Sequence, residues 1–222
     1  MDEWRNWGDA MVAMYLYVEG GGDDDLLYNA CRRGFTEFLI KSGLKGHMPR
    51  IVACGGRRDA YDRFCTKLRQ GQAAMLLVDS EEFVDPQYCQ GEPEQWQPWR
   101  HLAQRKGDEW AQPAGATDGQ CHLMVHCMES WFLSDPDALK TFFGQGYDAN
   151  KLPSRANAVE SVAKPVVYQA LAEATRHCKT KAPYGKGEHS FLLLARIDPA
   201  KVAAASPWAD RFVTILKKAM AC

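Results

Sequence analysis

Three short apolar runs in the first part of the chain each end in glycines or acidic residues. The runs are residues 11–18, 50–54 and 73–78. The first leads into Glu19 and a glycine turn, and the third leads into Asp79 and Glu81. Continuous apolar runs of this length are typical of strands buried on both faces of a parallel sheet. The pattern therefore predicts three buried strands, two of which carry acidic side chains at their carboxyl ends.

The segments between these runs space their apolar residues as a helix does. We expect one helix over residues 26–42, capped by Asp24 or Asp25 and stopped at Gly43, and another over residues 57–70. Strands that alternate with helices through short connections form a parallel sheet with right-handed crossovers. Ligands of such sheets bind at the carboxyl ends of the strands, where the acidic residues lie.

The rest of the chain predicts a long insertion and a helical end. Residues 86–119 are rich in Gln, Trp, Pro and Gly, and we expect an irregular insertion with one short helix. A fourth strand, a helix, a polar loop and a last helix are expected at residues 121–127, 165–179, 180–190 and 207–221. These elements predict a single α/β domain over residues 1–222, with its core at 11–135 and a helical C-terminal part at 136–222.

The composition is that of a globular protein without strong charge. Hydrophobic residues make up 46% and charged residues 25% of the 222 residues, and the formal net charge is −1. These values exclude a disordered chain and a strongly basic nucleic-acid coat. Contact with nucleic acid would therefore need a local patch, a bound metal or a partner.

Nothing in the sequence predicts export or membrane insertion. No apolar run approaches the ~20 residues of a membrane span, and residues 1–10 lack the pattern of a secretory signal. The eight cysteines are scattered and form no Cys-x-x-Cys pair. We therefore expect a cytoplasmic protein with reduced thiols and no membrane contact.

The acidic residues at the strand ends predict a metal site. Glu19, Asp79 and Glu81 would repel one another at one sheet edge unless a cation neutralised them. Carboxylate oxygens suit Mg²⁺ or Mn²⁺, and the Asp79-x-Glu81 spacing points both side chains to one face if the chain stays extended. The alternative is that these acids cap helices or lie in solvated turns.

The same residues resemble the Toprim pattern, in which Glu-Gly follows the first strand and an acidic pair follows a later one. Toprim domains occur in topoisomerases, DnaG-type primases and overcoming-lysogenization-defect nucleases. More closely, the chain resembles an uncharacterised bacterial domain-of-unknown-function family related to the RloB proteins. The matching stretches begin at Val18, Ile51, Leu77, His122, Met128 and Lys186 and cover most of the chain.

The resemblance implies a Toprim-like α/β fold, a mostly parallel sheet flanked by helices, and metal-dependent phosphodiester chemistry. It also implies pairing with an AAA/ABC-class ATPase encoded in the same phage-defence operon. Glu19 carries over as metal ligand or general acid/base, and Asp79 and Glu81 as metal ligands. The sequence departs from the common pattern because Glu81 stands where Asp is usual, and one extra methylene changes the geometry available to two ions.

Further polar residues are candidates for accessory roles, each beside an ordinary structural explanation. Lys186 and His189, in the expected polar loop, could neutralise a phosphate, or they could lie in a plain surface loop. Arg57 could position a phosphate, or it could be a solvated side chain at a helix start. Glu129 could join the acidic site or serve as a helix-dipole acid, and Asp23 is a further candidate in the first matching stretch.

Two functions fit these expectations. One is a Mg²⁺-dependent nuclease that cuts DNA or RNA as the effector of an anti-phage complex with a partner ATPase, with Lys186 assisting Glu19, Asp79 and Glu81. The other is a non-catalytic Toprim-like binding or sensor subunit of such a complex. Phosphoryl or nucleotidyl transfer to a small molecule is a third, weaker hypothesis. The glycines at residues 20–22 are not followed by Gly-Lys-Ser/Thr, so any ATPase is expected on a separate chain.

Overall fold

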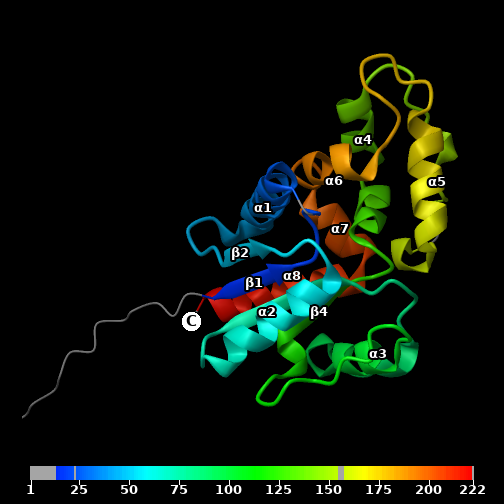
Figure 1. The fold of residues 1–222 in the computed structure, drawn as a ribbon. Coiled ribbons are helices and arrows are strands. Elements are labelled where there is room, and N and C mark those ends of the chain that lie inside the picture. The colour runs from blue at the N-terminus through cyan, green and yellow to red at the C-terminus, as the bar shows by residue number, and fades with distance from the viewer. Residues whose placement is uncertain (1–13, 23, 155–157, 222) are drawn as a thin grey trace, which may run out of the picture.

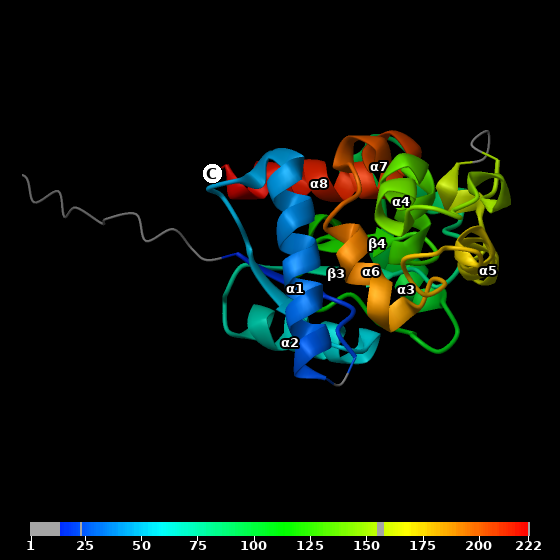
Figure 2. The ribbon, with the colours of Figure 1, turned by 90° about the horizontal axis from the view of Figure 1, so that it is seen from above.

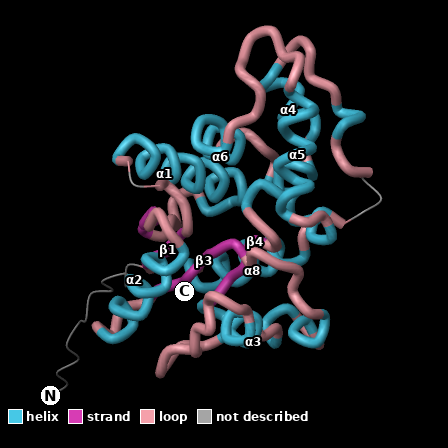
Figure 3. The backbone as a smooth tube through the Cα atoms, turned by 45° about the vertical axis from the view of Figure 1, so that its right-hand side comes forward, coloured by secondary structure: helices cyan, strands magenta, loops and turns pink. Residues whose placement is uncertain are grey.

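The sheet consists of four parallel strands. The computed structural model describes residues 14–22, 24–154 and 158–221. The strands are β1 (Tyr15–Val18), β2 (Arg50–Ala53), β3 (Ala74–Asp79) and β4 (Cys121–Met124). Their order is β2-β1-β3-β4, and every neighbouring pair is parallel. The predicted α/β class with a parallel sheet flanked by helices is confirmed, and it is the architecture expected of a Toprim-like fold (Figure 3).

Helices cover both faces of this sheet, and the alternation of side chains along the strands separates two cores. Leu16 and Val18 of β1 pack with α1 (Asp25–Leu39) and α8 (Pro207–Met220), whereas Tyr17 packs with α2 (Arg57–Arg69) and α3 (Pro98–Gln104). Successive residues of a strand point to opposite faces, so a strand buried on both faces has no polar side. Figure 1 shows helices on both sides of the strands, and burial on both faces is why the sequence has continuous apolar runs.

The strand register brings the two acidic ends together. Val18 lies opposite Leu77 of β3, and Asp79 at the end of β3 lies opposite Met124. Glu19, one residue past β1, continues the pairing, since its N–H donates to the carbonyl of Leu77 at 3.0 Å. The central pair β1–β3 therefore delivers Glu19 and Asp79 to the same sheet edge.

The C-terminal part of the chain folds back over this edge. It contains α4 (Pro136–Phe143), α5 (Lys164–Thr175), α6 (Lys186–Leu194) and α7 (Pro199–Ala205). Seen from above, α6 lies beside α1, while α5 stands at the outer side (Figure 2). The approach of α6 to α1 requires Gly34, because a Cβ there would meet the backbone oxygen of Phe191 at 2.8 Å. The helical C-terminal part is thereby placed to contribute side chains to the sheet edge.

Several predicted boundaries differ from the structure. Of the strand expected at 11–18, residues 11–13 lie outside the described part, and β4 ends at Met124 instead of Cys127. The polar loop expected at 180–190 is wrong from Lys186 onward, where α6 begins. Gly187, His189 and Ser190 lower the helix propensity at its start, and burial of Leu193 and Leu194 stabilises the helix instead.

The insertion is attached to the domain by aromatic packing. Besides α3 it contains 3₁₀ turns at Pro86–Cys89, Pro93–Gln95 and Asp118–Gln120. Trp99 and Trp110 are buried, and the ring of Trp110 stacks on that of Tyr61 at 4.7 Å.

Among the residues described, no helix is both long enough and apolar enough to cross a bilayer. The seven cysteines among the described residues all carry free thiols.

Candidate metal and phosphate site

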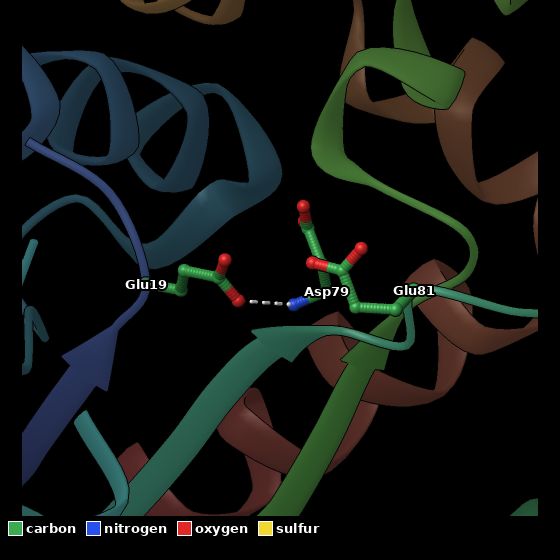
Figure 4. Close-up of side chains that lie close together, drawn as sticks. All are labelled: Glu19, Asp79 and Glu81. Atoms are coloured by element: carbon green, nitrogen blue, oxygen red, sulfur yellow. Dashed lines mark hydrogen bonds between the residues drawn. The ribbon is translucent and has the colours of Figure 1, made fainter. Parts of the chain in front are cut away.

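Three carboxylates converge at the carboxyl edge of the sheet. Each of Glu19, Asp79 and Glu81 offers an oxygen that lies within 4.8 Å of those of the other two. The backbone N–H of Asp79 donates to Oε2 of Glu19 at 3.0 Å, which fixes the first carboxylate against the end of β3. Figure 4 shows the three side chains pointing into one space from β1 and from the end of β3. The structure thus brings together the three acids predicted as ligands.

Glu81 reaches this space by a different backbone path from the one expected. An extended chain was expected between Asp79 and Glu81. Instead, Glu81 has φ of 64°, in the left-handed region that non-glycine residues rarely adopt. Its N–H donates to the carbonyl of His126 at 3.0 Å, and the N–H of His126 donates to the hydroxyl of Ser80 at 2.8 Å. These bonds hold a turn that redirects the Glu81 side chain toward Asp79, and such strain is common at functional sites.

Two cations from distant parts of the chain neutralise the acids. Nζ of Lys164, at the start of α5, lies 2.7 Å from Oε2 of Glu81 and 3.2 Å from Oδ2 of Asp79. Nη1 of Arg57 lies 3.5 Å from Oε2 of Glu19 and 3.9 Å from Oε1 of Glu81. The side chains are 19% and 14% exposed, so the charges are only partly screened by water. Three carboxyl groups therefore share two cations.

Arg57 is itself held by the insertion. Its guanidinium donates to the carbonyl of Asp79 and to the buried carboxylate of Asp108, which also pairs with Nη1 of Arg105 at 3.1 Å. Arg58, by contrast, points to solvent and pairs with Asp62. The two neighbouring arginines therefore differ. Arg58 is a solvated side chain, and Arg57 belongs to the acidic site.

The three carboxylates differ in their affinity for protons. Burial, reinforced by the charge of Asp79, raises the pKa of Glu19 to about 8. Burial raises the pKa of Asp79 to about 6, although Lys164 opposes the shift. For Glu81, burial acts in the same direction but the hydrogen bond and charge of Lys164 outweigh it, and the pKa is lowered. Near neutral pH, Glu19 carries a proton that Asp79 and Glu81 lack.

This difference predicts a pH-dependent stability of the protein without divalent metal. Between the ordinary glutamate pKa near 4.5 and about 8, folded Glu19 binds a proton that the unfolded chain releases, so stability falls as pH rises through this window. The variant Glu19→Gln removes this term and should be more stable than the wild type by roughly 2 kcal/mol at about pH 8, with less gain near pH 5. Urea unfolding in EDTA at both pH values measures the difference. An equal effect of the substitution at both would contradict the raised pKa.

A cavity of about 330 Å³ adjoins the carboxylates. Glu19, Asp79 and Glu129 line it together with Lys186 and Ser190 from α6, and the remaining lining is glycine or apolar. Nζ of Lys186 lies 5.5 Å from the ring centre of Tyr168, and its charge is among those that lower the proton affinity of Asp79. Lys186 thus belongs to the site region, at the first turn of a helix.

Glu129 is a buried carboxylate with hydroxyl partners. It is 1% exposed, and it accepts hydrogen bonds from Ser190 at 2.9 Å, Tyr168 at 3.1 Å and Tyr184 at 3.4 Å. Burial, and then the charge of Glu129, raises the pKa of both tyrosines, so their hydroxyls stay protonated as donors. The preceding N–H of Met128 donates to Oδ1 of Asp79 at 2.9 Å. Glu129 therefore ties α5 and α6 to the turn that supports Asp79.

Removing this carboxylate should destabilise the fold. We expect Glu129→Ala to lower the free energy of unfolding by roughly 3 kcal/mol, because it leaves buried hydroxyls without their acceptor. Glu129→Gln keeps an acceptor oxygen and should cost roughly 1 kcal/mol. The matched control is Glu188→Ala, which removes a glutamate side chain that is 67% exposed on α6, the helix that contacts Glu129 through Ser190. Urea unfolding checks the order, and equal effects of all three variants would contradict the assigned role.

One predicted accessory residue, His189, does not join this geometry. Nδ1 of His189 accepts a hydrogen bond from the N–H of Gly185 at 3.0 Å, and its ring packs edge-on against Phe142 and Phe143. The structure therefore places His189 in the core and not beside the carboxylates. Asp23 lies outside the described residues.

Sequence reasoning missed Lys164 and Asp108. Lys164 stands next to Pro165 at the start of an expected helix, and nothing local indicates that its ammonium contacts acids more than eighty residues away. Asp108 lies in the insertion, whose pattern predicted irregular structure with one short helix. Their roles arise from tertiary packing alone.

The acidic cluster has the chemistry of a divalent-cation site. Its donors are carboxylate oxygens, which Mg²⁺ and Mn²⁺ prefer. The three oxygens lie within 4.8 Å of one another, near enough for side-chain rotations to bring them to a single ion. Glu19, Asp79 and Glu81 therefore fit such an ion, and Lys164 holds the position of a competing cation.

Comparison with known proteins gives a family match. A family model described as domain of unknown function (DUF4276) matches residues 18–217, which is most of the chain. No curated protein and no solved structure matches the chain.

Proposed function

The chain belongs to the DUF4276 family, and we propose that it is a metal-dependent hydrolase of phosphodiester bonds in DNA or RNA. The observation that carries this proposal is the convergence of Glu19, Asp79 and Glu81 within 4.8 Å at the sheet edge where ligands of parallel α/β folds bind. Three acids that approach so closely, beside a cavity with a lysine, suit a cation and a phosphate better than they suit solvent.

The residues of the site divide the work as follows. A bound Mg²⁺ or Mn²⁺ would supply Lewis acidity toward a phosphate oxygen. Asp79 and Glu81 would hold the ion, and Glu19 would either share it or exchange a proton with the reacting oxygens, since its pKa of about 8 is close to working pH. Lys186 would offset the charge of the phosphate. Arg57 positions Glu19 and the end of β3 without leaving its partner Asp108.

The biological setting that we propose rests on the resemblance to RloB-related and Toprim proteins. In that setting the chain acts in the cytoplasm as an anti-phage effector and assembles with a partner AAA/ABC-class ATPase. The net charge of −1 agrees with a need for a partner that delivers the nucleic acid.

A second function is favoured by one specific observation. Lys164 and Arg57 already neutralise much of the acidic cluster, so the carboxylates could serve a metal-free structural role. The chain would then be a non-catalytic binding or sensor subunit of the same complex. The two functions differ in whether a divalent cation displaces the ammonium of Lys164.

Cleavage assays separate these functions. Plasmid DNA, single-stranded DNA and total tRNA are incubated with the chain in Mg²⁺, in Mn²⁺ and in EDTA, each with and without the ATPase encoded beside it. Metal-dependent cleavage of any substrate supports the hydrolase. No cleavage in any combination, with the complex assembled, would support the binding subunit.

A further inference from the structure

The cavity beside the acidic cluster is small and is kept open by glycines. Its 330 Å³ lies at the lower end of the range of about 300–1,000 Å³ that small-molecule sites occupy. Gly20, Gly21 and Gly22 form one side, each with positive φ, and a Cβ on Gly20 would meet the ring of Phe191 at 3.0 Å. The chain therefore leaves space there for a group of about the size of a single nucleoside.

The cavity has an apolar middle between polar ends. Leu27, Met128 and the ring of Phe191 supply the apolar surface, and Phe191 is the aromatic side chain among the lining residues. Leu27 and Phe191 are half-buried and Lys186 is exposed, so the cavity reaches the surface between α1 and α6. An aromatic face at the mouth of an apolar slot is the usual platform for a nucleobase.

The polar groups complement a base that carries a phosphate. Glu19 presents a carboxyl group, which can exchange hydrogen bonds with the polar atoms of a base edge. The oxygens of Glu129 already accept from Ser190, Tyr168 and Tyr184, so they serve to hold the wall of the cavity. Among the described residues of the lining, Lys186 supplies the one positive charge, and Asp79 faces the cavity from the cluster that we assign to the metal. In a duplex the base edge is paired and stacked, so only an unpaired base can enter.

We propose that this cavity binds one unpaired nucleobase of a single-stranded nucleic acid, with the adjoining phosphate between Lys186 and the acidic cluster. The inference rests on the proposed function and narrows it, because the substrate is then a single strand, a loop or a frayed end. The aromatic residues of the insertion do not serve this purpose, since Trp99 and Trp110 are buried.

Gly187 offers a way to fill the cavity without disturbing the fold. It lines the cavity in the first turn of α6, and a Cβ there meets nothing within 4 Å. Leucine also favours a helix more than glycine does. Gly185, two residues earlier, has equal room and lies outside the lining, so Gly185→Leu is the matched control for Gly187→Leu.

The test measures binding and does not require turnover. Fluorescence anisotropy in Ca²⁺ follows a labelled single-stranded octanucleotide, a blunt duplex of the same sequence and an octamer made wholly of abasic sites, with dAMP as a competitor. We expect the single strand to bind at least about tenfold tighter than the duplex, the abasic octamer or dAMP. Gly187→Leu should weaken binding of the single strand about tenfold, Gly185→Leu should change it less than twofold, and both should bind Mn²⁺ as the wild type does.

Each contrary result overturns the inference. Equal affinity for the abasic octamer or the duplex would show that no base enters the cavity, and dAMP binding as tightly as the octamer would indicate a free-nucleotide site. Unchanged binding in Gly187→Leu would place the base elsewhere. Base-dependent binding without any hydrolysis would contradict the proposed function and leave this inference standing. Hydrolysis of duplex at the rate of single strand would support the proposed function and contradict this inference.

Discussion

Replacing Glu19 by glutamine is expected to lower phosphodiester hydrolysis at least ~10³-fold while the protein remains folded. Glutamine matches the shape of the protonated side chain and keeps an oxygen for the N–H of Asp79, which donates to Glu19 at 3.0 Å. It cannot lose a proton, so it can neither act as an anionic ligand nor accept a proton from a reacting group. The substitution should therefore lower the rate of hydrolysis without unfolding the protein, and initial rates on the best substrate in Mn²⁺ measure this loss.

Glu82→Gln is the matched control for Glu19→Gln. The Glu82 side chain is 66% exposed, one residue beyond Glu81, and its nearest cation is Nε of Arg105 at 3.8 Å. We expect the rate of this variant to stay within about twofold of the wild type, as is usual for surface changes. A Glu19→Gln protein that cleaves at the wild-type rate would remove this carboxylate from the reaction.

Replacing Lys164 by methionine should destabilise the metal-free protein and tighten its hold on a divalent cation. The ammonium contacts Glu81 at 2.7 Å and Asp79 at 3.2 Å. Methionine leaves the Glu81 carboxylate with Arg57 at 3.9 Å, and the Asp79 carboxylate with the N–H of Met128. Because the site is partly exposed, we expect a loss of roughly 2 kcal/mol in EDTA, less than for a fully buried pair. A cation no longer has to displace an ammonium, so its dissociation constant should fall about tenfold, and Mg²⁺ should restore much of the stability.

Urea unfolding in EDTA and in Mg²⁺, together with Mn²⁺ titration, measures both effects. Lys140→Met, at an exposed lysine of α4, serves as the control and should change neither quantity appreciably. If Lys164→Met bound Mn²⁺ more weakly than the wild type, the ammonium would be supporting the metal site and not competing with it.

The sheet and its acidic edge could be predicted because local patterns encode them. Continuous apolar runs specify strands buried on both faces, and the chain alternates them with helices, which leaves a parallel sheet as the simplest arrangement. Glu19 and Asp79 follow directly from this topology, since strands β1 and β3 are parallel neighbours that end at one edge. The order of the elements therefore predicts that both acids lie at one edge, and the structure adds that β1 and β3 are neighbours.

The remainder of the site depends on contacts that no local pattern encodes. Lys164 reaches the acids only because α5 folds back over the sheet edge, and Arg57 turns inward only because Asp108 of the insertion receives it. Glu81 reaches the cluster through a left-handed backbone, which the expected extended chain did not include. Helix α6 carries Gly187 in its first turn, which lowers its helix propensity, and packing against α1 stabilises its conformation.

The helical C-terminal part links folding to function in this account. Lys164 of α5 and Lys186 of α6 both extend to the acidic edge, and Glu129 ties the same two helices to the turn beside Asp79 through Tyr168 and Ser190. A movement of these helices would change the cations around the carboxylates. A partner that binds the helices could therefore adjust the site without touching it.

Titration of Mn²⁺ into the metal-free protein at about pH 8, followed by calorimetry or electron paramagnetic resonance, tests the central claim most directly. We expect saturable binding to the wild type, loss of that binding in Asp79→Asn, and weaker binding near pH 6, where Glu19 keeps its proton. A wild-type protein that binds no Mn²⁺ at millimolar concentration would contradict that claim. The acidic cluster would then be an internal salt-bridge network of Lys164 and Arg57, and the binding-subunit function would replace the hydrolase.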